Sequence, residues 1–179
     1  MSILTQSTIA NKVSLSGIGV HTGEFVNLNI LPSSPNSGII FKRIDLQKNN
    51  IIVPNFENVS EATLCTTISN EYGVKVSTIE HLMAALLGLG IDNAIVEVDS
   101  QEVPILDGSA INFVNILKKN GIKKSDVPIK LIKINNKVEI EDGNKYISIE
   151  KSNTALEIEF EINYKNQLIK NQKNKINVF

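Results

Sequence analysis

Residues 77–90 constrain the fold more than any other stretch, because their apolar positions follow the period of an α-helix. Ser77 is followed three residues later by Glu80, which is a capping-box pattern for a helix start. Gly88 and Gly90 are typical of a helix end. Between these signals, apolar side chains recur three or four residues apart, as on one buried helical face: Ile79, Leu82, Met83, Leu86 and Leu87.

Glu80 and His81 both fall in the first turn of this predicted helix. The helix dipole at that end favours an ionised Glu80 and disfavours a protonated His81. A carboxylate that accepts a proton, beside a neutral imidazole that binds metal, is the pair that a zinc hydrolase uses. The local pattern alone favours a simpler interpretation, because the HExxH spacing that supplies two zinc ligands is absent. In that interpretation Glu80 caps the helix and His81 is a solvated surface residue.

The composition indicates a globular protein and excludes several classes of partner. The 179 residues are 42% hydrophobic and 21% charged, and the net charge is −1. Such a charge gives no electrostatic basis for binding nucleic acid or an anionic membrane. No apolar run reaches membrane-spanning length, and the first residues lack the basic-then-apolar build of a signal peptide. The length suits one full domain and part of a second.

The possible metal ligands are few: two histidines, His21 and His81, and a single cysteine, Cys65. A three-histidine zinc site cannot be built from them, and one cysteine excludes an internal disulfide and suits a reducing cytoplasm. Cys65 is typical of a small buried apolar residue, with metal binding as the alternative. His21 lies among the glycines of residues 16–23. That stretch predicts either a hairpin loop with an exposed histidine or a phosphate cradle, although the P-loop and dinucleotide patterns are absent.

Short β-prone segments surround the predicted helix. A second helix is predicted at residues 110–120, begun by Ser109 and ended by Gly121. Asp107 precedes a glycine and is typical of a turn, with a carboxylate that orients a ligand histidine as the alternative. These elements predict an α+β first domain from residue 1 to residue 126. The strands are expected at residues 9–15, 25–31, 39–43, 51–53, 63–68, 74–76 and 93–98.

The rest of the chain, residues 127–179, predicts an incomplete, β-rich start of a second domain. The polar residues 123–128 end in proline and indicate a domain boundary. Asp142-Gly143 predicts a hairpin. We interpret residues 165–175 as a polar tail with little to bury, before a strand that is cut off at its start. The other strands of this part are expected at residues 130–140, 145–150 and 155–162.

Five segments together resemble the UDP-3-O-acyl-N-acetylglucosamine deacetylases of lipid A biosynthesis. They occur in the family's order along essentially the whole chain, with a weaker sixth, EDGNK, at 141–145: GIGVHTG at 17–23, LCT at 64–66, TIEHLMAAL at 78–86, GLGIDN at 88–93 and EVPILDGS at 102–109. The resemblance implies a cytoplasmic, zinc-dependent amide hydrolase of a Gram-negative-type bacterium. Its substrate would be a UDP-linked acylated glucosamine, from whose nitrogen acetate is removed.

The resemblance also implies a fold and residue roles. The family fold has two similar α+β domains, each a helical pair packed on a sheet, with the active site between them. By motif, His81 would be a zinc ligand, and Glu80 would be the general base that takes a proton from zinc-bound water. His21 and Cys65 would lie near the mouth of the site. Lys145 would approach the nucleotide phosphates.

The family pattern continues beyond what this chain contains, for roughly another domain's length. That part carries two further zinc ligands, a histidine that protonates the leaving amine, and a threonine that stabilises the oxyanion. We therefore expect the N-terminal portion of a monomeric enzyme, inactive by itself, for which a C-terminal half could be the complementing partner. The alternative is a binding or regulatory module that keeps the fold without catalysis.

Overall fold

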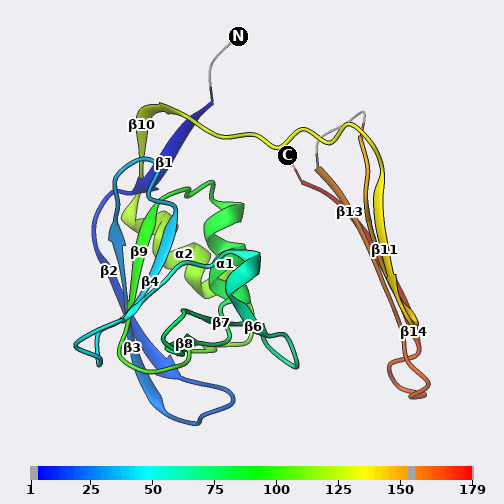
Figure 1. Ribbon diagram of the computed structural model, residues 1–179, viewed down its shortest axis with the longest axis horizontal. Coiled ribbons are helices and arrows are strands. Elements are labelled where there is room, and N and C mark those ends of the chain that lie inside the picture. The colour runs from blue at the N-terminus through cyan, green and yellow to red at the C-terminus, as the bar shows by residue number, and fades with distance from the viewer. Residues whose placement is uncertain (1–3, 153–155, 179) are drawn as a thin grey trace. The chain divides into compact units, whose positions relative to one another are not determined.

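The computed structural model describes residues 4–152 and 156–178. They form two compact units, one that ends at Ile129 and one that begins at Lys130. The described residues are mostly β-strand, with two α-helices, and both helices belong to the first unit (Figure 1). No helix in this part of the chain is long and apolar enough to cross a lipid bilayer.

A five-stranded sheet forms the centre of the first unit, in the order β2-β3-β9-β4-β5. Neighbouring strands are antiparallel except β4 and β9, which run parallel with Phe41 opposite Val96. The predicted strand at residues 39–43 is confirmed. The strand predicted at residues 93–98 is also present, but it begins one residue later, at Ala94. The strands are β2 (Val13–Ile18), β3 (Phe25–Pro32), β4 (Ile39–Arg43), β5 (Ile51–Ile52) and β9 (Ala94–Val98).

This sheet is buried on one face only, and its sequence alternates accordingly. On β3, Val26, Leu28 and Ile30 are completely buried, whereas Asn27 is exposed and Asn29 is half-buried. Successive side chains of a strand point to opposite faces of the sheet. An apolar–polar alternation therefore gives one buried face and one solvent-exposed face.

Two helices pack their apolar sides into the same core as the inner face of the sheet: α1 (Glu80–Gly88) and α2 (Ile111–Asn120). Leu82 and Leu86 of α1, and Phe113 and Leu117 of α2, are at most 1% exposed. The predicted end of the second helix is confirmed, because Gly121 follows it with φ of +85°.

The buried face predicted for the first helix is wrong at one position. Leu87 is 78% exposed, although Leu86 beside it is buried. Positions 79, 82 and 86 already fill the side of α1 that faces the core, and residue 87 lies 100° further round the helix.

A two-stranded ribbon joins the two ends of the first unit: β1 (Thr5–Ile9) pairs antiparallel with β10 (Ile122–Pro128). The single strand predicted at residues 9–15 is therefore wrong, because β1 ends at Ile9 and β2 begins in the other sheet at Val13. The polar residues 123–128, predicted as a domain boundary, form most of β10, and the first unit ends directly after them at Ile129. Five of the seven residues of β10 are exposed, so no apolar alternation marks this strand.

Buried amides attach β1 to the central sheet. Gln6 is 5% exposed and Asn93 is 2% exposed, and Asn93 Nδ2 donates to Gln6 Oε1 at 3.0 Å. Asn93 Oδ1 accepts the N–H of Gly38 at 3.0 Å, and Asp92 Oδ2 accepts the N–H of Ser7 at 2.7 Å. Buried polar groups need such partners, which gives Asp92 and Asn93 of the GLGIDN segment a structural role.

A small three-stranded sheet follows a single 3₁₀ turn: η1 (Phe56–Asn58), β6 (Val59–Glu61), β7 (Thr67–Ser69) and β8 (Lys75–Val76). The strand predicted at residues 63–68 is wrong over residues 63–66, because β7 begins only at Thr67. Leu64 has φ of +65°, which breaks an extended run, and it is 88% exposed.

The second unit consists of two antiparallel hairpins: β11 (Val138–Asp142) with β12 (Lys145–Ile149), and β13 (Leu156–Asn163) with β14 (Asn171–Val178). The hairpin predicted at Asp142-Gly143 is confirmed, with Asp142 opposite Lys145. The predicted strand at 130–140 is present only from Val138. The predicted start of the next strand, Ala155, lies outside the described residues.

The polar tail predicted at residues 165–175 is wrong from Asn171 onward, where β14 begins. Two lysines of β14 form ion pairs with glutamates of β13: Lys173 with Glu159 at 2.6 Å and Lys175 with Glu157 at 2.8 Å. Cross-strand charge pairs of this kind support a ladder in a strand with few apolar residues.

Candidate functional site

The segment before α1 brings Glu80 to its position by a sharp turn at Thr78. Thr78 is 3% exposed and has φ of +56°, which a β-branched residue rarely adopts. The chain on either side is held by backbone hydrogen bonds: Ser77 N–H to Gln101 O at 2.9 Å, and Met83 N–H to Ile79 O at 2.9 Å. Glu80 is therefore the first residue of the helix.

The predicted capping box is wrong. The N-cap residue is Ile79, which makes no side-chain capping bond, and the Ser77 hydroxyl donates instead to Gln101 O at 3.1 Å. Because the turn at Thr78 separates Ser77 from the helix, Ser77 and Glu80 cannot exchange the reciprocal bonds of that motif.

Glu80 instead contacts the loop that carries Cys65. The Thr66 N–H donates to Glu80 Oε2 at 3.1 Å, and the Ile79 N–H donates to Thr66 O at 3.5 Å. Cys65 is half-buried, with Sγ 3.7 Å from Thr67 Oγ1. Two segments that the sequence separates by 14 residues therefore meet at the start of α1. His81 is the second residue of the helix and is half-buried.

His21 lies in the loop of the β2–β3 hairpin, and its side chain is exposed. The hairpin interpretation of this glycine-rich stretch is confirmed, with Ile18 opposite Phe25. The His21 N–H points to Glu102, at 3.1 Å from Oε1 and 3.2 Å from Oε2.

Glu102 is the residue that sequence reasoning missed. It is completely buried. It accepts hydrogen bonds from the loop of residues 19–24, which we call the His21 loop, and from the Thr78 hydroxyl. A glutamate is almost never fully buried unless it is paired. The available signal was a lone carboxylate directly before the apolar residues 103–106.

Glu102 is held in its ionised form. Burial by itself raises the pKa of this carboxyl, but hydrogen bonds from the Thr22 and His21 N–H groups and from the Thr22 and Thr78 hydroxyls together outweigh burial. The net effect is a pKa below the ordinary value of glutamate.

Asp107 closes a turn, as the simpler interpretation predicted. Its Oδ1 accepts the Ser109 N–H at 3.1 Å and the Ser109 hydroxyl at 3.0 Å. These two bonds hold the pKa of the exposed Asp107 carboxyl below its ordinary value. Among the described residues, the structure shows no hydrogen bond between Asp107 and a histidine.

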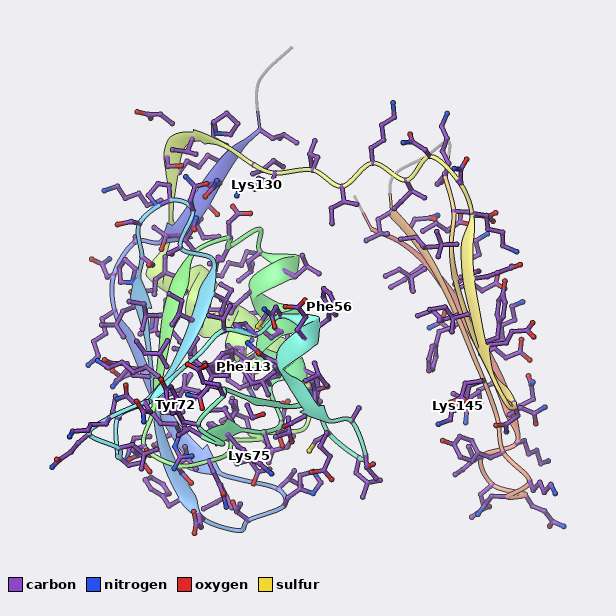
Figure 2. The ribbon with its side chains drawn as sticks, viewed as in Figure 1. Phe56, Tyr72, Lys75, Phe113, Lys130 and Lys145 are labelled. Carbon is purple, nitrogen blue, oxygen red and sulfur yellow. The ribbon has the colours of Figure 1, made fainter. Side chains whose placement is uncertain are left out.

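Lys145 belongs to the second unit, where it is the exposed first residue of β12. Figure 2 shows it on the strands of that unit and Phe113 within the first. The residues predicted for the site therefore fall into two groups. Glu80, His81, His21 and Cys65 lie in the first unit, and Lys145 does not.

The described residues do not make up a complete zinc site. A catalytic zinc requires three protein ligands and an open position. Within residues 4–152 and 156–178, no three His, Cys, Asp or Glu side chains gather in a way that could hold a metal ion. The start of α1 offers one imidazole, His81, beside one carboxylate, Glu80.

The family model described as LpxC, UDP-3-O-acyl N-acetylglycosamine deacetylase, matches residues 6–179 of this chain. The chain belongs to this deacetylase family. The family consists of zinc-dependent amide hydrolases of lipid A biosynthesis. The resemblance inferred from the sequence segments is therefore confirmed.

Relatives named UDP-3-O-acyl-N-acetylglucosamine deacetylase are similar over most of this chain. The protein from Shewanella baltica (strain OS155) is 44% identical over 162 residues, which cover 90% of this chain and 53% of the relative. The protein from Shewanella oneidensis (strain MR-1) is 43% identical over the same length. This chain thus spans about half the length of the curated deacetylases that it matches.

Proposed function

We propose that this chain forms the N-terminal part of a cytoplasmic, zinc-dependent deacetylase that removes acetate from a UDP-linked 3-O-acyl-N-acetylglucosamine. The family match over residues 6–179 carries the proposal. The meeting of Glu80 with the Cys65–Thr66 loop supports it, because this contact joins two of the family-like segments at one place.

In this proposal Glu80 is the general base. The Thr66 N–H bonded to Oε2 fixes the orientation of the carboxylate, which then takes a proton from the attacking water. His81, one residue further along the helix, supplies one imidazole to zinc, together with ligands from outside the described residues. Zinc acts in such hydrolases as a Lewis acid that also makes water more acidic.

The remaining predicted residues have supporting roles. His21 and Cys65 are assigned to the mouth of the site, and Lys145 to the nucleotide phosphates. We further propose that residues 1–126 are one helix-on-sheet domain of the family type and that a second, similar domain begins after them. Two compact units with a division at residue 129 support this organisation.

A chimaeric enzyme tests the proposal. This chain replaces the matching half of the Shewanella baltica deacetylase, and acetate release from the UDP-sugar is measured together with the zinc content. Glu80→Gln should lower kcat by about 10²–10⁴-fold with zinc retained, since it removes a base but no ligand. His81→Ala should lose the zinc. Glu71→Gln, in an exposed turn, is the matched control and should change neither quantity.

Three outcomes would contradict parts of the proposal. Loss of zinc in Glu80→Gln with retention in His81→Ala would reverse the two roles. A folded but inactive wild-type chimaera would favour the non-catalytic binding module. Acetate release by the isolated 179-residue chain, stopped by a chelator, would show that the donors it contains suffice for catalysis.

A further inference from the structure

Glu102 joins two segments of the site that the sequence holds far apart. Glu102 itself forms a parallel β-bridge with Ser77, and the Val103 N–H donates to Ser77 O at 3.1 Å. Its side chain is 0% exposed and reaches the loop of residues 19–24, about 80 positions earlier in the chain.

The carboxylate oxygens divide their hydrogen bonds between these segments. Oε2 accepts the Thr22 N–H at 2.9 Å and the Thr22 hydroxyl at 2.8 Å, while Oε1 accepts the Thr78 hydroxyl at 2.8 Å. The His21 N–H lies between the two oxygens, at 3.1 and 3.2 Å. Four donors converge on one buried anion, and hydrogen bonds to a charged acceptor are the strong ones.

We propose that Glu102 is a positioning residue, which holds the His21 loop at a fixed distance from the start of α1 and so orients Glu80 and His81. The proposal rests on the proposed function for the roles of these two residues. The connection runs through Thr78, which is bonded to Glu102 and stands two residues before Glu80.

The backbone around Glu102 is adapted to this contact. Thr78 holds a left-handed φ of +56°, so the turn that starts α1 needs an external restraint, and its hydroxyl bond to Glu102 supplies one. On the other side, a Cβ on Gly19 would lie 2.5 Å from Thr22 Oγ1 and closer still to Glu102 Oε2. Only a glycine allows the loop to approach the carboxylate this closely.

An ionised carboxylate is the group that fits four donors, because it presents two oxygens that both accept. Glutamine keeps the shape but replaces one oxygen with an amide nitrogen that can only donate. Facing the Thr22 and His21 N–H groups, that nitrogen could accept neither of them. Facing Thr78, it could still donate to the hydroxyl oxygen, but the charged acceptor that four donors share would be lost. In Glu102→Gln the bonds that join the loop to the turn should therefore weaken.

The first test uses the 179-residue chain and does not depend on activity. In ¹H–¹⁵N spectra, Glu102→Gln should shift the Thr22 and His21 amides and, through Thr78, the ring resonances of His81. Thr78→Val removes one donor and should shift the His81 ring, whereas Thr78→Ser keeps the hydroxyl and should restore most of the wild-type spectrum. Glu71→Gln should leave all these signals unchanged.

The second test uses the chimaeric deacetylase. Glu102→Gln and Thr78→Val should each lower kcat by about 10–100-fold, with KM changed by less than about threefold, because small misplacements of catalytic groups affect turnover most. Thr78→Ser should recover most of the lost kcat.

Unchanged His81 ring resonances in both Glu102→Gln and Thr78→Val would overturn the proposal, even if both variants melt earlier, because a purely structural carboxylate changes stability alone. Unchanged kcat in both variants would also overturn it. If Glu102→Gln does not fold, Thr78→Val decides. If the wild-type chimaera is inactive, the proposed function fails while the spectra still test the positioning role.

Discussion

The loop that carries His21 passes so close to Glu102 that one residue, Gly19, has no room for a side chain. Its φ is not in the left-handed region, so space rather than backbone conformation requires glycine here. Gly88, at the end of α1, is the opposite case, because nothing lies within 4 Å of a Cβ built on it.

Alanine at these two positions should therefore change stability in opposite directions. Gly19→Ala should lower the free energy of unfolding by about 1–3 kcal/mol, the usual cost of forcing atoms into a packed site. Gly88→Ala should raise it by about 0.5–1 kcal/mol, since glycine in a helix loses more backbone entropy than alanine. Urea unfolding followed by far-UV circular dichroism measures both. Equal effects of the two variants would show that the loop can move away from Glu102.

Among the elements, α1 depends on packing rather than on its own stability. Its nine residues are fewer than an isolated helix needs in water. Its N-terminus makes no side-chain capping bond. Leu82, Ala85 and Leu86 bury it against the sheet, so the core determines where Glu80 and His81 stand.

Two adjacent leucines on α1 test this dependence. Leu86→Ala should lower the free energy of unfolding by about 2–5 kcal/mol, because it leaves a cavity at a site that is 1% exposed. Leu87→Ala makes the same chemical change at a site that is 78% exposed and should change stability by less than about 0.5 kcal/mol. Similar losses in both variants would mean that Leu87 is covered in solution.

At the scale of the whole molecule, the two units differ in how much they bury. The first unit encloses a core that draws on the sheet and both helices. In the second, nearly all described residues of the two hairpins are exposed, including Ile140, Ile147 and Phe160. Two-stranded hairpins are marginally stable without further packing, so the second unit should open more readily than the first.

Limited trypsin digestion should follow this division. The segment between β10 and β11, residues 129–137, has no regular structure and contains Lys130, Lys133 and Lys137, so cleavage should begin there. Lys123 and Lys124 should be cut later, because β10 is hydrogen-bonded to β1. Mass spectrometry of the early fragments identifies the sites. Simultaneous cleavage at all five lysines would mean that the β1–β10 ribbon is not formed in solution.

The sequence by itself determined the features that depend on neighbouring residues. The strands at residues 25–31 and 39–43, the helical period around residue 82, the turn at Gly143 and the helix end at Gly121 were all predicted correctly. Each reflects backbone geometry or side-chain spacing within a few positions. The family-like segments, rather than the local pattern alone, singled out Glu80 and His81 as the candidate pair, and the match to the family model confirmed the family.

Only the tertiary structure decided the features that depend on contacts between distant residues. β10 and β14 are too polar to be recognised alone, and each exists because a partner strand satisfies its backbone groups. The capping box fails because Thr78 is bonded to a glutamate 24 residues away. Glu102 became visible as a buried acceptor for the same reason, since four donors converge on its carboxylate only once the chain has folded.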